Sequence, residues 1–358
     1  MPKIAFIWPC FPWRWWIAHH TNQMINAYLN NWDRVWVFTF SRQYPRFLYP
    51  GKAQIEPDWT QNPLPKSNNF ILKKSIDTLN PISWYMTAAS IIKQKPKYCL
   101  IKYWHPYFVP CFTFIAWLLR RRKIPIVCIV DNLYPHERHR GDSLLTRIFF
   151  SQVSCAITQS EIVHKEFLTS FPYIPETIIA HPAYNEFWPK IWKIEARKKL
   201  NIPQNKKILL FFGFIRPYKG LEMLLSIMPK LITKYPNIHL LIAGECFGSF
   251  EPYDRLIHEL HLSKYLTLHL SYTKNSEIPT YFGACDLLVM PYRTITNSGI
   301  ENIGKVYAKK SLLMVGATPN ELFHGIVSAL NWNINVLKPI WWDEYCYQLE
   351  KFLFKYIN

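Results

Sequence analysis

The sequence lacks the marks of several protein classes. Its eight cysteines include no Cys-x-x-Cys pair, and no His, Cys or Asp cluster has the spacing of a metal site. Several of these cysteines stand inside apolar runs, as Cys128 does in Ile-Val-Cys-Ile-Val, so we expect buried thiols in a reducing compartment. A hydrophobic fraction of 49% excludes a disordered chain.

The chain also lacks an apolar run long enough to span a membrane. Residues 107–119 come nearest, but they are shorter than the ~20 residues a span requires, and Pro110 interrupts them. Four cations, Arg120 to Lys123, follow. These residues fit two structures equally: an amphipathic helix on an anionic membrane, or a core helix whose last cations complement its dipole. We expect the first residues to begin a strand rather than a signal peptide.

Acidic residues are scarce beside basic ones. The chain has 42 Lys and Arg against 24 Asp and Glu, a net charge of +18, and 16% aromatic residues. Nucleic acid, an anionic membrane surface or anionic small substrates would each explain this charge. No motif that reads RNA or DNA is present, and no helix concentrates the cations, so a nucleic-acid partner is not expected.

Short strand-like runs alternate with helical stretches along the chain, which predicts an α/β protein with parallel sheets covered by helices. The strands are too many for one comfortable sheet, and a Pro-, Trp- and Lys-rich segment at 181–205 separates two series. We therefore predict domains at 1–190 and 191–340, with an amphipathic helix at 341–358 that returns to the first domain. Residues 41–79 are predicted to form a long, partly ordered excursion.

The most informative segment begins at Ile208. An apolar strand ends at Gly213, a short loop carries Arg216 and Lys219, and a helix with apolar residues at 3.6-residue spacing starts near Gly220. Open α/β sheets bind anionic ligands at such a turn. The fork of an Arg and the point charge of a Lys together suit a diphosphate.

Further motifs follow this loop in a fixed order: Leu240–Glu245, Asp286–Tyr292 and Thr296–Gly299. Together they resemble the nucleotide-binding domain of glycosyltransferase family 4. One bacterial branch of that family is also similar to the first half of the chain, at Ile17–Asn22, Gln43–Arg46, Pro50–Lys52, Trp104–Pro106 and Asp131–Glu137. The resemblance covers roughly residues 1–310.

The resemblance implies a GT-B fold, with two Rossmann-like domains facing a central cleft. It implies retaining transfer of a sugar from a nucleotide-sugar to a glycan or lipid-linked acceptor, without a metal or other cofactor. The expected place is bacterial surface-polysaccharide synthesis, in the cytoplasm or at the inner face of the plasma membrane. Two alternatives remain open. One is a catalytically degenerate GT-B protein that binds a nucleotide or a glycan or acts as a partner subunit, and the other is a nucleotide-sugar epimerase.

The resemblance also assigns site residues. Catalysis is expected from Arg216, Lys219 and His136. The donor is expected to meet Gly213, Arg216, Lys219, Tyr272, Ser298, Gly299 and Glu301. The acceptor or cleft is expected to involve Trp15, Trp16, His19, His20, Asp131, Asn132 and Glu137.

The chain departs from the family pattern in three respects. Trp15 and Trp16 stand where a Gly-Gly loop is usual. Two indoles there predict a reshaped acceptor pocket, aromatic anchors at a membrane interface or an obstructed donor site. The two usual glutamates, eight residues apart, are replaced by Ile295 and Ile303. Asp131 stands where a histidine often follows the fourth strand.

Overall fold

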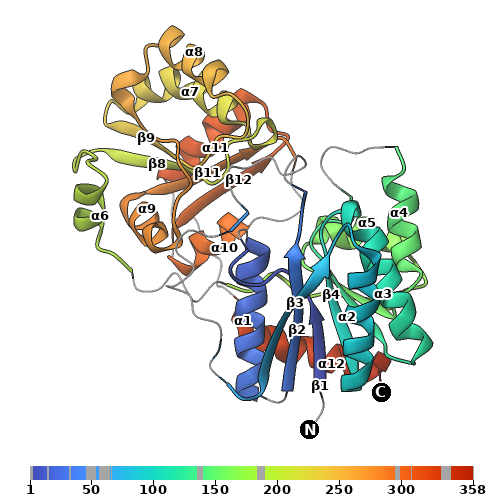
Figure 1. Cartoon of the computed structure of the whole chain (residues 1–358). Coiled ribbons are helices and arrows are strands. Elements are labelled where there is room, and N and C mark those ends of the chain that lie inside the picture. The colour runs from blue at the N-terminus through green and yellow to red at the C-terminus, as the bar shows by residue number, and fades with distance from the viewer. Residues whose placement is uncertain are drawn as a thin grey trace. The chain divides into compact units, whose positions relative to one another are not determined.

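A computed structural model describes residues 3–13, 16–31, 34–45, 54–55, 65, 67–134, 140–183, 190–294, 299–307, 309–331 and 340–357; within these, the side chains of 16, 17, 30 and 31 are left undescribed. The chain forms two compact units, shown in Figure 1. Unit 1 comprises residues 1–182 and 340–358, and unit 2 comprises residues 183–339. The sequence predicted boundaries at 190 and 340.

Unit 1 contains a seven-stranded parallel sheet in the order β3-β2-β1-β4-β5-β6-β7. The strands are β1 (Lys3–Ile7), β2 (Arg34–Arg42), β3 (Phe70–Asp77), β4 (Tyr98–Tyr103), β5 (Ile126–Val130), β6 (Cys155–Thr158) and β7 (Glu176–Ile178). Because consecutive strand residues point to opposite faces, Ala5 and Ile7 enter one core cluster while Ile4 and Phe6 enter the other.

Helices cover both faces of this sheet. The first face packs α2 (Pro81–Gln94), α3 (Val109–Arg121), α4 (Asp142–Phe150) and α5 (Glu161–Ser170), after the short η3 (Pro106–Phe108). The second face packs α1 (Trp16–Asn31) and the C-terminal α12 (Trp342–Ile357). Glu350 of α12 accepts hydrogen bonds from the hydroxyls of Tyr28 (3.0 Å) and Tyr98 (2.7 Å), which ties α12 to α1 and β4.

Two sequence interpretations of unit 1 are resolved. Within the long, partly ordered excursion predicted over 41–79, residues 41–42 belong to β2 and residues 70–77 form β3, a strand that was not predicted. This strand lies at the sheet edge and carries Lys73 and Lys74, so its apolar alternation is weak. Residues 109–119 belong to a core helix, because the apolar side of α3 packs into the core. Seven of the eight cysteines are buried, and all eight are free thiols.

Unit 2 contains a five-stranded parallel sheet in the order β10-β9-β8-β11-β12. Its strands are β8 (Lys207–Phe212), β9 (Ile238–Ala243), β10 (Leu266–His269), β11 (Leu287–Tyr292) and β12 (Lys310–Val315). Its helices are α6 (Lys193–Lys199), α7 (Leu221–Lys234), α8 (Glu251–Glu259), α9 (Ile278–Ala284), α10 (Gly299–Val306) and α11 (Pro319–Asn331), with short turns η5 (Pro217–Lys219), η6 (Ser263–Tyr265) and η7 (Asn275–Glu277).

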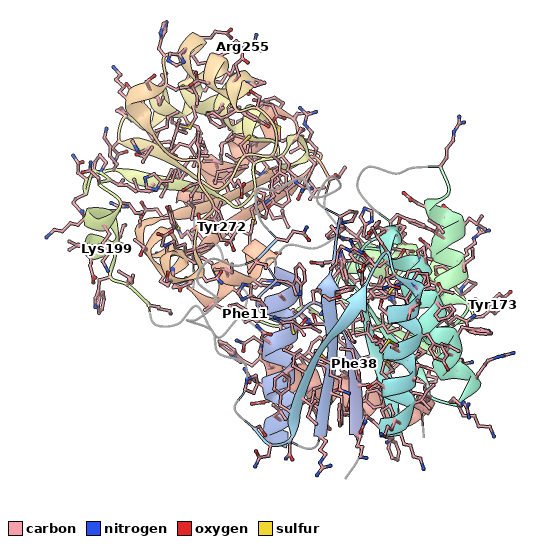
Figure 2. All side chains as sticks on the ribbon, in the orientation of Figure 1. Phe11, Phe38, Tyr173, Lys199, Arg255 and Tyr272 are labelled. Carbon is pink, nitrogen blue, oxygen red and sulfur yellow. The ribbon has the colours of Figure 1, made fainter. Side chains whose placement is uncertain are left out.

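The sheet of unit 2 is also covered on both faces. Leu209 and Phe211 point to the face packed by α7, α8 and α11. Phe212 points the other way and contacts Phe282 of α9, with ring centroids 5.1 Å apart. Side chains fill both units, as Figure 2 shows for the buried Phe38 in unit 1. Among the helices of the described residues, none has both the length and the apolar character to cross a membrane.

Candidate functional site

The carboxyl ends of β8 and β11 bring together the residues predicted to bind a diphosphate. Gly213 follows β8 with φ of 95°, which favours glycine, and its N–H donates to the Ala243 carbonyl at 2.9 Å. A Cβ at Gly213 would lie 2.6 Å from Cδ1 of Ile300 and 3.0 Å from Nζ of Lys219. The glycine therefore allows Lys219 and the first turn of α10 to meet at the end of β8.

A second glycine holds the loop against β11. Gly220 begins α7 with φ of 69°, and a Cβ there would lie 2.0 Å from the Pro291 carbonyl oxygen. The Arg293 N–H donates to the Tyr218 carbonyl at 2.7 Å, and its guanidinium pairs with Glu222 at 2.5 Å. The loop that carries the two predicted cations is thus fixed at both ends before any ligand binds.

Lys219 is a buried cation. Only 6% of it is exposed, and Nζ lies 5.5 Å from the ring centroid of Tyr292. Burial, together with the nearby positive charge of Arg216, lowers the pKa of Lys219 to about 7. Within the described residues no carboxylate forms an ion pair with it. An anion placed here would oppose this shift, because an opposite charge favours the protonated form of the lysine.

Arg216 lies among aromatic rings. Its guanidinium carbon is 4.2 Å from the centroid of Phe247, which in turn meets Phe214 edge-on at 4.7 Å. Phe214 also lies 6.4 Å from Tyr272, labelled in Figure 2, which connects this predicted donor-binding residue to the phosphate loop. A parallel bridge between Ile215 and Cys246 positions this cluster. The flat faces of these aromatic rings are suited to stacking against a planar group that lies beside a diphosphate.

Helix α10 begins at Gly299, as the motif predicts. Oε1 of Glu301 lies 3.4 Å from Nζ of Lys305, one turn later in the helix. Ile303 is fully buried. Ile303, which stands at the position of the second family glutamate, therefore serves the core. Ser298 and Ile295 lie outside the described residues.

Two of the residues predicted for unit 1, Asp131 and His20, lie near a buried lysine that sequence reasoning missed. Asp131 follows β5, and its Oδ1 lies 2.8 Å from Nζ of Lys102, which is 1% exposed. Burial raises the pKa of Asp131 and lowers that of Lys102, and the ion pair opposes both shifts. Lys102 also donates to Gln159 at 3.4 Å and lies 5.6 Å from the ring of Trp8. A lone cation inside the apolar strand Tyr98–Tyr103 was the available signal.

Both predicted histidines of α1 are buried. Nε2 of His20 lies 2.9 Å from the amide of Gln159, and the rings of His181 and Trp342 are each 4.9 Å away. Burial, followed by the charges of Lys102 and His181, lowers the pKa of His20 well below its ordinary value, so this imidazole is neutral. His19 is also buried.

The other candidates of unit 1 add less. Asn132 is half-buried after β5. His136, Glu137 and Trp15 lie outside the described residues, as does the side chain of Trp16. The prediction of an obstructed or reshaped pocket therefore stays a prediction. Among the described residues, no group of three His, Cys, Asp or Glu is arranged to hold a metal.

Two parallel α/β units, one of them with a basic turn at its carboxyl edge, define the GT-B fold. Comparison with solved structures supports this class: Anabaena HepE in complex with UDP and glucose matches with a TM-score of 0.71 and 13% identity, over 99% of each chain.

The family comparison concerns the part of the chain that carries the basic turn. Residues 193–307 match the family model of glycosyl transferases group 1. The GDP-mannose:glycolipid 4-beta-D-mannosyltransferase of Xanthomonas campestris pv. campestris is 27% identical over 191 residues, 53% of this chain and 50% of that protein. The lipopolysaccharide core biosynthesis mannosyltransferase LpsB of Rhizobium meliloti is 28% identical over 122 residues, 34% of this chain and 35% of that one. The chain spans about half the length of the first of these relatives. These similarities support a glycosyltransferase.

Proposed function

We propose that this chain transfers a sugar from a nucleotide-sugar to a glycan or lipid-linked acceptor, in bacterial surface-polysaccharide synthesis at the cytoplasmic side of the membrane. The observation that carries the proposal is the convergence of Gly213, Lys219 and the start of α10 at the end of β8, with Arg216 on the same loop. Two relatives are named as mannosyltransferases, one of them acting on a glycolipid.

The chemistry of the loop fits a leaving diphosphate. As the bond between the sugar and the nucleotide breaks, negative charge grows on the phosphate next to the sugar. Lys219 and Arg216 stabilise that charge, and the N-terminal end of α10 adds the N–H groups of its first turn and the positive end of its dipole. Since Lys219 is buried, water screens its charge little. These two cations supply the counter-charge, so the proposed reaction proceeds without a metal.

The first test is thermal stability in the presence of UDP, GDP, ADP or CMP. A ligand at 100 times its dissociation constant adds about 2.7 kcal/mol to the free energy of unfolding, and each kcal/mol raises the midpoint by roughly 2–4 °C. We expect one nucleotide to raise the midpoint, and Lys219→Ala to remove the rise. Lys199→Ala, at an exposed lysine of α6 seen in Figure 2, is the control and keeps it. No rise with any nucleotide would contradict the proposal.

The stereochemistry needs its own measurement. The family resemblance implies retention at the anomeric carbon, whereas the Xanthomonas relative is named for a β-linked mannoside. The anomeric configuration of the product, read by NMR against that of the donor, tests retention directly. An inverted product would remove retention from the proposal and leave sugar transfer in place.

A further inference from the structure

Helix α2 turns large apolar side chains to solvent. Ile82 is 70% exposed, Met86 64% and Tyr85 59%, and Leu79 just before the helix is 51% exposed. Ile82, Tyr85 and Met86 are three and four residues apart, so they form one stripe, and the exposed Lys93 continues it seven residues after Met86. We call Leu79, Ile82, Tyr85 and Met86, with Lys93, Lys95 and Lys97, the α2 surface.

The opposite side of α2 packs against the sheet, so the exposed stripe is not the core-facing side of this helix. Thr87, Ala88 and Ile91 are buried against the sheet. Trp84 donates from Nε1 to the Asp77 carbonyl at 2.7 Å, and Thr87 donates to Ser75 at 2.9 Å. The helix also has an N-cap at Asn80. A rigid helix that presents a continuous apolar stripe marks an interaction surface.

The charge beside the stripe has one sign. Residues 78–130 contain eight Lys or Arg and no Asp or Glu; seven of these cations are exposed, and Lys102 is buried against Asp131. Asp77, just before this segment, pairs with Arg42. Helices α2 and α3 lie side by side, with the rings of Trp84 and Phe114 6.0 Å apart (Figure 1). Both helices follow parallel strands of one sheet, so their C-terminal ends share an edge. Lys93, Lys95 and Lys97 therefore lie at the same edge as the exposed cations of residues 120–123.

We infer that unit 1 docks on an anionic lipid bilayer through the α2 surface. Its apolar residues enter the boundary between head groups and acyl chains, and the lysines meet lipid phosphates. This inference deepens the proposed function, on which it rests for its purpose. The apolar end of α2 lies at the carboxyl edge of the sheet, where Asp131 directly follows β5. A lipid-linked acceptor would therefore reach that edge from the bilayer.

The test is sedimentation with phosphatidylcholine vesicles that contain or lack phosphatidylglycerol. The triple variant Ile82→Ser, Tyr85→Ser, Met86→Ser is expected to lower the partition coefficient at least tenfold. The matched control replaces three other exposed apolar residues of unit 1, Ile162, Leu168 and Tyr173 (the last labelled in Figure 2), by Ser and changes it less than about twofold.

A second variant tests the charge. Lys93→Gln, Lys95→Asn and Lys97→Gln are expected to lower binding to anionic vesicles roughly fivefold per cation and to weaken its salt dependence. Asn suits Lys95, whose φ is 51°. Equal binding of wild type to neutral and anionic vesicles, or an unchanged partition of the Ser variant, would overturn the inference. So would a dimer of wild type that the Ser variant loses, because the surface would then bind a second copy.

Nucleotide affinity separates this inference from the proposed function. The Ser variant is expected to bind the nucleotide as wild type does. Vesicle binding without any nucleotide binding would leave the docking surface standing and remove the glycosyltransferase proposal.

Discussion

Each unit buries one lysine at the carboxyl edge of its sheet, and the two have different surroundings. Lys102 of unit 1 lies 2.8 Å from Asp131 and also reaches Gln159. Lys219 of unit 2 has Arg216 as its charged neighbour, and burial and that neighbour lower its pKa to about 7. A buried cation with a carboxylate partner is balanced inside the protein, whereas one beside another cation is suited to an anion from outside.

The charged neighbour of each lysine distinguishes a structural role from a functional one. Both lysines are nearly inaccessible to solvent, so burial alone does not distinguish their roles. The charged partner distinguishes them. The ion pair of Lys102 and Asp131 links β4 to the end of β5, whereas Lys219 lies on a turn where Gly213 leaves room for its side chain. Removing the partner of Lys102 should therefore damage the fold, and removing Lys219 should damage binding and turnover.

The largest expected effect is on the stability of unit 1. Asp131→Asn leaves Lys102 buried without its counter-charge and is expected to lower the free energy of unfolding by about 3–5 kcal/mol, measured by urea denaturation. The double variant Lys102→Met with Asp131→Leu removes both charges and should recover most of that loss. A loss below ~1 kcal/mol in Asp131→Asn would show that water already reaches this pair.

Turnover should respond at the other lysine. Lys219→Ala is expected to slow sugar transfer by about 3 kcal/mol of transition-state stabilisation, roughly 150-fold, and Arg216→Ala by a similar factor. Lys219→Met, which removes a buried charge without opening a large cavity, is expected to keep or raise the thermal midpoint. Turnover of both Ala variants within a few-fold of the Lys199→Ala control would remove the assigned phosphate role.

Much of the fold was predictable because its elements carry strong local patterns. The apolar strand predicted to end at Gly213 is β8, which ends one residue earlier at Phe212, and β5 ends where its apolar run ends. β3 escaped prediction because an edge strand tolerates Lys73 and Lys74, and α11 lies where the family pattern fades. Alternation is weakest where one side of a strand faces solvent.

The candidate site was less predictable. The loop from Gly213 to Lys219 was found because a strand, a turn and a helix follow one another in sequence. Lys102 was missed because its partners Asp131 and Gln159 come from later strands, and their meeting depends on strand order, which local pattern does not reveal. The burial of His20 likewise involves contacts with Trp342 and Tyr345 of α12, far away in sequence.

Nucleotide affinity should depend on pH through Lys219. Its pKa is about 7 without ligand, and a bound diphosphate raises it by supplying an opposite charge. The protonated form binds, so the dissociation constant is expected to stay level just below pH 7 and to rise by up to about tenfold per pH unit above it. Calorimetry at several pH values measures this. Lys219→Arg keeps its charge throughout and should flatten the profile; an equally steep profile in that variant would assign the titration to another group.

The smallest expected effect is that of metal removal. If Arg216 and Lys219 supply the counter-charge of the leaving diphosphate, treatment with EDTA should change turnover less than about twofold, and added Mg²⁺ should not restore turnover to Lys219→Ala. Loss of activity in EDTA that Mg²⁺ restores would mean that a divalent ion shares this charge. The contrast between the two buried lysines would then hold for folding only, because unit 2 would meet the diphosphate through a metal as well as through its own cations.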